Sequence, residues 1–302
     1  MAEPGFISTP DGKRLRVAVF DAPASARGVC VLAHGQTEFI EKYCEVIGEL
    51  NARGFTVATF DWPGQGGSYR LLGNPLKAHI GSFTQYDAAI EAFLDQVVKP
   101  IAARPPIALA HSMGGHNMLR LMHDRPNALA AAVLTAPMLR AGTRGVPRRL
   151  ALGALYLQNL FGNGDEWIWG MDKRDPIDMG FDRQLVTSDR ARFQRTQDII
   201  KAHPDLRLAG PTWKWLQRAN ASMAEVTAPG YAEAILTPVL IVGAGRDRIV
   251  ETEAERAFAP RLPHGKYVEL ADAEHEILME NDSIRARFWQ AFDAFIDDNV
   301  PS

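Results

Sequence analysis

Short apolar runs that alternate with helical segments constrain the fold of this chain more than any other feature. The runs lie at residues 29–33, 55–60, 107–110, 130–135, 238–242 and 267–270, and residues 14–20 add a half-exposed alternating pattern. Such runs are typical of parallel strands that are buried on both faces. Apolar residues at helical spacing occur in residues 41–53, 82–98, 114–123, 251–258 and 283–295. Strands that alternate with helices predict an α/β protein with a mostly parallel, doubly wound sheet.

The middle of the chain interrupts this rhythm. Residues 139–235 contain no convincing strand signal and are helix-like, with frequent Gly and Pro. The strand pattern resumes at residues 238–242. A chain of 302 residues suits one α/β core that carries an insertion. We therefore predict a core of residues 1–138 and 236–302, and a helical insertion of residues 139–235.

Composition and charge exclude several classes of protein. A net charge of −3 gives no reason to expect a nucleic acid partner. No stretch reaches the ~20 apolar residues of a membrane span, and the first residues lack the pattern of a secretory signal. The two cysteines, Cys30 and Cys44, cannot form a disulfide framework. They are best interpreted as reduced thiols, which predicts a cytoplasmic protein.

The strongest chemical signal is Ser112, between a short strand and a helix. A nucleophilic serine on such a sharp turn has strained backbone angles, so small residues must flank it. Gly114 and Gly115 provide them on one side, and Ala110 stands on the other. The alternative is a serine that simply caps the following helix. We interpret Ser112 as a nucleophile.

A serine nucleophile needs a base within hydrogen-bonding distance, and the base needs an acid to orient it. His275 follows the predicted strand at residues 267–270, and the carboxyl ends of strands are where α/β sites form. A solvated surface histidine is the alternative interpretation. We expect His275 to be the base.

The acid candidate is Asp247, shortly after the strand at residues 238–242. From there a carboxylate reaches a histidine on the loop of the next strand. Asp247 could instead pair with Arg246 or Arg248 at the surface. Asp272 and Glu274 are weaker candidates, because they are too close in sequence to the histidine.

Two backbone N–H groups should stabilise the oxyanion that forms during acyl transfer. One is the amide of Met113, directly after the nucleophile. The other is expected in the loop after the strand at residues 29–33, where Gly35 permits a turn and Gln36 offers its amide. His34 and Glu38 would then support the loop. The alternative is an ordinary turn.

Five motifs in this order point to one family. They are residues 34–38 (HGQTE), 60–68 (FDWPGQGGS), 111–115 (HSMGG), 247–250 (DRIV) and 275–280 (HEILME). With them the chain resembles the α/β-hydrolase superfamily, within it the monoacylglycerol lipase and lysophospholipase group, and especially lysophospholipase L2-like bacterial proteins. The resemblance covers both halves of the core and is weak across the insertion.

This resemblance implies a triad of Ser112, Asp247 and His275, with Gln36 and Met113 as oxyanion donors. It also implies that residues 139–235 form a cap over the pocket. The sequence departs from the family pattern in two places. Ala110 replaces a glycine, and the dipeptide at 62–63 is Trp-Pro where the family more often has His or Arg. The second departure leaves the conformation of that turn open.

Four of the six tryptophans lie in the insertion: Trp167, Trp169, Trp213 and Trp215. They are candidates for an apolar pocket that binds an acyl chain. The alternative is that they pack the cap against the core. The cap is also a candidate for transient contact with a membrane surface.

The sequence therefore predicts a serine carboxylic-ester hydrolase that acts on single-chain acyl esters such as monoacylglycerols or lysophospholipids. A lactonase or a short-chain carboxylesterase would use the same residues. A non-catalytic ligand-binding protein is the alternative of another class. No cofactor is expected, and Met279 stands where a zinc motif would need a second histidine after His275. The oligomeric state is not predicted.

Overall fold

A central sheet of eight strands organises the protein, with the order β1-β2-β4-β3-β6-β7-β9-β10. The computed structural model describes residues 4–22, 27–143, 145–169 and 175–300. The strands are β1 (Gly5–Ser8), β2 (Arg14–Phe20), β3 (Gly28–Ala33), β4 (Phe55–Phe60), β6 (Ile107–His111), β7 (Ala131–Thr135), β9 (Val239–Ala244) and β10 (Gly265–Leu270). In this order, every pair of adjacent strands from β4 to β10 is parallel. The strands β1 and β2 lie at one edge, where β1 pairs with β2 and β2 pairs with β4 in antiparallel orientation. The predicted fold class is confirmed.

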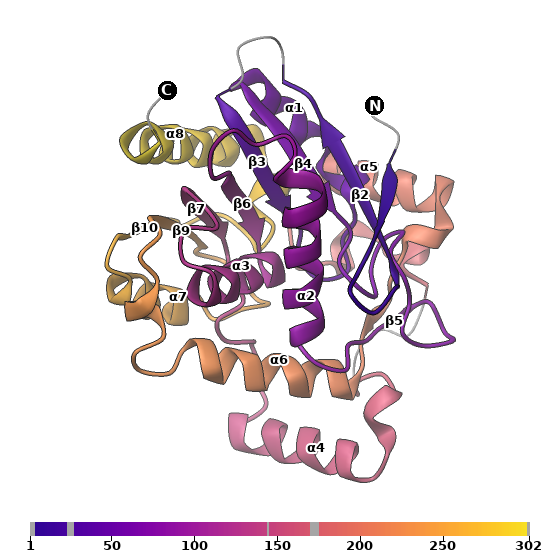
Figure 1. Ribbon diagram of the computed structural model, residues 1–302. Helices are drawn as coiled ribbons and strands as arrows, with labels where there is room; N and C mark the ends of the chain where they lie inside the picture. Colours follow the sequence, from indigo (N-terminus) through magenta and orange to yellow (C-terminus); the bar gives the residue numbers. More distant parts are fainter. Residues whose placement is uncertain (1–3, 23–26, 144, 170–174, 301–302) are drawn as a thin grey trace.

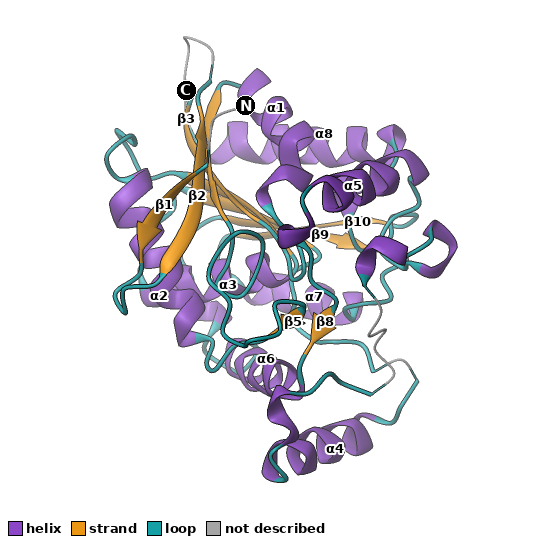
Figure 2. Cartoon of the chain, turned by 90° about the vertical axis from the view of Figure 1, so that its right-hand side faces the viewer, coloured by secondary structure: helices purple, strands orange, loops and turns teal. Residues whose placement is uncertain are grey.

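Helices cover both faces of this sheet, as Figure 2 shows from the side. The α-helices of the described residues are α1 (Cys44–Ala52), α2 (Thr84–Phe93), α3 (Met113–Asp124), α4 (Arg148–Leu160), α5 (Arg190–Ala202), α6 (Trp213–Val226), α7 (Thr252–Phe258) and α8 (Asp282–Asn299). The side chains of β3 alternate between two cores. Val31 packs with α2 and α3, whereas Cys30 and Leu32 pack with α1 and α8. The fully apolar β3 run is therefore explained by burial on both faces.

The segment between β7 and β9 is mainly helical, but it differs from expectation in two ways. It contains a strand, β8 (Gly210–Pro211), which pairs with β5 (Lys77–Ala78). Two residues carry no alternating pattern, so sequence reasoning missed these strands, as it missed β1. In addition, α6 belongs to the main core through Ala219, Met223 and Val226. The helix α4 lies beyond α6 (Figure 1).

Helices long and apolar enough to cross a bilayer are absent from the part of the chain that the structure describes.

Burial of α8 should contribute strongly to stability. Phe292 is fully buried beside Trp289, at 5.2 Å between ring centroids. We expect Phe292→Ala to lower the free energy of unfolding by about 3–5 kcal/mol, because it removes apolar contacts and leaves a cavity. Denaturant unfolding measures this. Gln290→Ala, on the exposed side of the same helix, is the control and should change stability by less than ~0.5 kcal/mol.

Candidate active site

The backbone at Ser112 has a conformation that non-glycine residues rarely adopt, with φ +51° and ψ −114°. Ser112 links the end of β6 to the start of α3. Its N–H donates to the Thr135 carbonyl at 2.9 Å, and its own carbonyl accepts from Met138 and His116, both at 3.0 Å. The end of β7, the segment after it and the first turn of α3 therefore hold the strained turn in place, as is typical of functional sites.

On the helix side of this turn, the position of Gly114 has no room for a side chain. A Cβ atom at Gly114 would lie 2.4 Å from the carbonyl oxygen of Ala33 and 2.6 Å from that of His34. Ala110 instead occupies a regular position in β6 and is fully buried in the core. The departure from the family pattern at Ala110 is thus accommodated as an ordinary core methyl group.

Ser112, His275 and Asp247 form one hydrogen-bonded chain. The Ser112 Oγ lies 3.0 Å from His275 Nε2, and His275 Nδ1 lies 2.6 Å from Asp247 Oδ2. The other carboxylate oxygen, Oδ1, accepts from the N–H groups of Ile249 at 2.7 Å and Val250 at 2.9 Å. Every polar atom of the imidazole thus has a partner. Parallel β6, β9 and β10 bring together residues that are far apart in sequence because their carboxyl ends share one edge.

The competing acids next to the histidine have other partners. Glu274 binds Arg248, with 3.2 Å between charged atoms. Asp272 binds Arg287 at 2.6 Å. Asp247 is therefore the acid that the structure places on His275, and Arg248 is engaged elsewhere.

Burial and charge act against each other at the histidine. Burial lowers the pKa of His275, but the Asp247 carboxylate and nearby glutamates outweigh it, so that the pKa lies above the ordinary 6.5. At Asp247, burial favours a higher pKa. The His275 imidazole and the backbone N–H groups outweigh burial, so the pKa of Asp247 lies below its ordinary value. The neighbouring His111 is different, because burial lowers its pKa to about 4 and keeps it neutral. The carboxylate thus stabilises a positive charge on His275 when a proton arrives.

The loop after β3 carries the backbone amide of Gln36. Its neighbours are occupied, since Gly35 N–H donates to the Glu38 carboxylate and Thr37 N–H donates to Gln65 Oε1 at 2.5 Å. Within the described residues, the amides of Gln36 and Met113 donate to no protein acceptor. The loop packs on Ser112, because a Cβ at Gly35 would lie 3.3 Å from the Ser112 Cβ.

The turn at residues 60–68, left open by the sequence, supports this loop. Trp62 Nε1 donates to the carbonyl of His34 at 2.9 Å. Asp61 is fully buried and accepts from Ile40 N–H at 2.9 Å and from Arg16 at 2.9 Å. Sequence analysis missed the supporting roles of Asp61 and Gln65, although both lie in a motif that it singled out.

The four candidate tryptophans do not share one environment. Trp215 is buried and donates to the Tyr86 hydroxyl at 3.0 Å. Trp213 is also buried, with Trp169 packed edge-on against it and largely exposed. Trp167 lies beside the Lys77 ammonium. Packing within the fold therefore explains Trp213 and Trp215.

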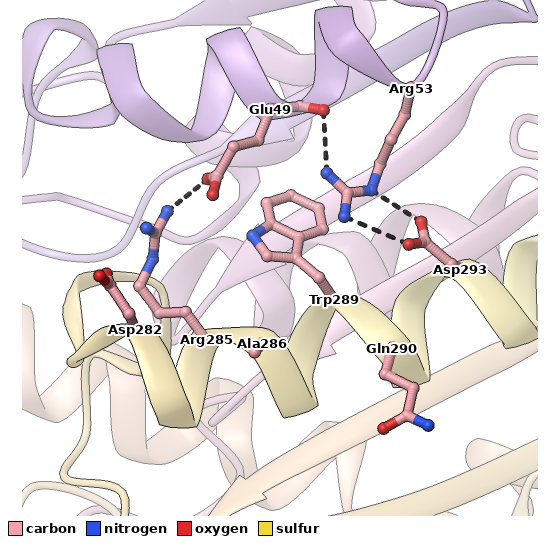
Figure 3. Close-up of a pocket in the computed structure, with 8 residues that line it drawn as sticks. All are labelled: Glu49, Arg53, Asp282, Arg285, Ala286, Trp289, Gln290 and Asp293. Atoms are coloured by element: carbon pink, nitrogen blue, oxygen red, sulfur yellow. Dashed lines mark hydrogen bonds and ion pairs between the residues drawn. The ribbon is translucent and has the colours of Figure 1, made fainter.

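A surface hollow of about 500 Å³ lies between α1 and α8 (Figure 3), and its lining includes none of the residues Ser112, Asp247 and His275. Its charged side chains bind one another: Arg53 pairs with Asp293 at 2.7 Å, and Arg285 pairs with Glu49. Arg53 also lies over the Trp289 ring. This hollow is a structural contact between two helices and not the candidate active site.

Gly114→Ala should disrupt the turn, because the new methyl group would collide with two backbone carbonyls that cannot move aside. We expect poor folding or a drop in melting temperature of several degrees, measured by thermal unfolding. Ala110→Gly is the matched control on the other side of Ser112. A folded, stable Gly114→Ala protein would contradict this account of the turn.

Comparisons with known proteins agree with this geometry. A model of the Hydrolase_4 family, described as serine aminopeptidase S33, matches residues 24–282. Lysophospholipase L2 of Escherichia coli is 31% identical over 284 residues, which cover 91% of this chain and 82% of that protein. A probable lysophospholipase L2 of Haemophilus influenzae is 24% identical and covers 91% of this chain and 86% of its own.

Among solved structures, a soluble variant of monoglyceride lipase from Saccharomyces cerevisiae is similar, with a TM-score of 0.77 and 18% identity. The match covers 100% of this chain and 96% of that one, and at this identity it shows the fold alone. The resemblance inferred from the motifs is confirmed. This chain belongs to the Hydrolase_4 family and is a serine hydrolase with the α/β-hydrolase fold.

Proposed function

We propose that the protein hydrolyses single-chain acyl esters, such as lysophospholipids and monoacylglycerols, with Ser112 as nucleophile. The observation that carries this proposal is the hydrogen-bonded chain in which His275 lies 3.0 Å from the serine oxygen and 2.6 Å from Asp247. A serine hydroxyl is unreactive unless a positioned base removes its proton.

In the first half of the reaction, Ser112 Oγ attacks the ester carbonyl while His275 Nε2 takes the serine proton. Asp247 stabilises the resulting imidazolium. The negative charge that develops on the substrate oxygen is stabilised by the N–H groups of Gln36 and Met113. His275 then donates the proton to the leaving alcohol, and an acyl group remains on Ser112.

In the second half, water enters in place of the alcohol. His275 accepts a proton from the water as its oxygen attacks the acyl-enzyme. The same two N–H groups stabilise the second oxyanion. Collapse releases the fatty acid and returns the proton to Ser112.

We also propose that residues 139–235 act as a cap over this site. The cap is bonded to both loops that carry the triad partners. Gly142 N–H donates to the Ile249 carbonyl at 2.9 Å, beside the acid, and Glu276 N–H donates to the Val186 carbonyl at 2.7 Å, beside the base. A cap anchored there borders the space through which an ester must approach.

The substrate class is supported by the name of the Escherichia coli relative, a lysophospholipase. A lactonase or a short-chain esterase would use the same chemistry, and the family description also includes aminopeptidases. The cytoplasmic location predicted from the cysteines stays a prediction.

A substrate panel tests the proposal. We expect turnover of lysophospholipid, monoacylglycerol and long-chain nitrophenyl esters, and a loss of at least about 10³-fold in Ser112→Ala, which lacks the nucleophile. The panel also includes acetyl esters, a lactone and an aminoacyl nitroanilide. Wild-type activity no higher than Ser112→Ala on every ester would contradict the hydrolase, and a preference for two-carbon esters, the lactone or the nitroanilide would contradict only the substrate class.

An exposed apolar surface on α4 supports contact with lipid. The large apolar side chains on α4 that are exposed to solvent include Leu150 (67%), Tyr156 (62%) and Leu160 (63%), and Phe161 (71%) follows directly after the helix. Leu155 alone among the described residues of α4 is buried. Arg148 and Arg149 begin the same helix, which lies at the outer edge of the molecule (Figure 1). We propose that α4 rests on an anionic phospholipid surface, because apolar groups beside cationic ones fit that partner.

Vesicle sedimentation tests this contact. We expect the triple variant Leu150→Ser, Leu160→Ser, Phe161→Ser to bind phosphatidylglycerol-containing vesicles at least about tenfold more weakly, since each apolar side chain buried in lipid contributes about 1.5–3 kcal/mol. Leu236→Ser, at an exposed apolar residue outside α4, is the control. Hydrolysis of a dissolved short ester should be unchanged. Undiminished vesicle binding by the triple variant would contradict the lipid surface.

A further inference from the structure

A buried lysine joins the two loops that meet at Ser112. Lys42 lies in the short helical turn Ile40–Tyr43, and its side chain is only 7% exposed. Its Nζ lies 2.7 Å from Glu38 Oε1 and 2.6 Å from Glu276 Oε1. Removing three charges from water costs free energy that an apolar cluster would not require. This arrangement calls for a role beyond packing.

One end of the bridge holds the loop that carries Gln36. The Glu38 carboxylate accepts the N–H of Gly35, directly before Gln36, and the hydroxyl of Tyr43 at 2.8 Å. With Lys42 on its other oxygen, the carboxylate has a partner on every side. A rotation of the Glu38 side chain would break its hydrogen bond with the Gly35 N–H. The next peptide in the chain, which carries the Gln36 N–H, would then no longer be held in one orientation.

The other end of the bridge holds the loop that carries His275. Glu276 is the next residue, so the position of its carboxylate constrains the backbone from which the imidazole extends. Burial raises the pKa of Glu276, and the Lys42 ammonium opposes this effect and favours the ionised form. The ion pair therefore connects a group beside the base to a group beside the oxyanion donor.

We propose that Lys42 is a positioning residue that keeps the Gln36 amide and the His275 ring aligned on Ser112 by binding Glu38 and Glu276 at once. This inference rests on the proposed roles of Ser112 and His275. It adds a residue that touches no reacting atom and acts only through the two glutamates.

The charges around the histidine determine how the bridge should affect its titration. The groups that face it are Asp247 after β9, Glu38 after β3, Glu276 on its own loop, the neutral His111 of β6, and Lys42 behind the glutamates. Burial lowers the pKa of His275, and the carboxylates raise it. Because the base must be unprotonated to act, activity rises as the pH passes through this pKa. A lost carboxylate should move that rise to lower pH.

The first experiment is the pH profile of kcat/KM on a soluble nitrophenyl ester. For wild type we expect the acidic limb to have its midpoint above pH 6.5, the ordinary value for histidine. Glu276→Gln keeps the shape of the side chain and removes its charge, so we expect the midpoint to fall by about half a unit or more. Glu274→Gln is the control. It removes the charge of the residue directly before His275 in the sequence, where the carboxylate binds Arg248, and it should leave the midpoint unchanged.

The second experiment replaces the lysine. We expect Lys42→Met to lower kcat at least about tenfold with KM within about threefold of wild type, because misplacing an oxyanion donor costs up to ~10²–10³ in rate. Lys42→Arg retains the positive charge and should restore part of the loss. If Lys42→Met does not fold, Glu276→Gln still tests the bridge through its pH profile.

Labelling of Ser112 by a fluorophosphonate distinguishes a failure of the proposed function from a failure of the proposed role of Lys42. If wild type is not labelled, the proposed function fails. If wild type is labelled, and Glu276→Gln has the wild-type pH midpoint or Lys42→Met retains the wild-type kcat, the bridge is overturned while the proposed function stands.

Discussion

The strained backbone of Ser112 is the constraint on which the rest of the site depends. Its positive φ is stable because β7 and the start of the segment after β7 bind its N–H and carbonyl on both sides. The turn places Oγ 3.0 Å from His275 Nε2. It also requires Gly114, because a larger residue would meet the backbone of the loop after β3. Ser112 and the loop after β3 are thus packed as one unit.

Buried charge is the second organising feature, and it is compensated at each place described above. Asp61 binds Arg16 and backbone N–H groups, whereas Glu38 and Glu276 share Lys42. A buried ion pair adds little net stability, but removing one partner leaves a charge without compensation. Such networks therefore hold their loops in one arrangement. Here they surround the loop of Gln36 and the loop of His275.

Much of the fold was predictable from local patterns. Apolar runs of strand length and helical periodicities identified the core strands and helices, since burial on both faces leaves a clear signal. The two-residue strands β5 and β8 leave none, because pairing there depends on a distant backbone. The incorporation of α6 into the core was equally hidden, because an apolar helix face does not reveal which surface will cover it.

The sequence by itself determined the fold class, the family and the identities of Ser112, Asp247 and His275 as candidates, because glycine spacing and strand-end positions are local properties. Only the tertiary structure decided that these three side chains are hydrogen-bonded to one another. It alone also decided that the amides on both sides of Gln36 are bound within the protein, and that Lys42 connects two loops separated by more than two hundred residues. The physical reason is that distances between residues remote in sequence are set by sheet order and by packing, which no local pattern encodes.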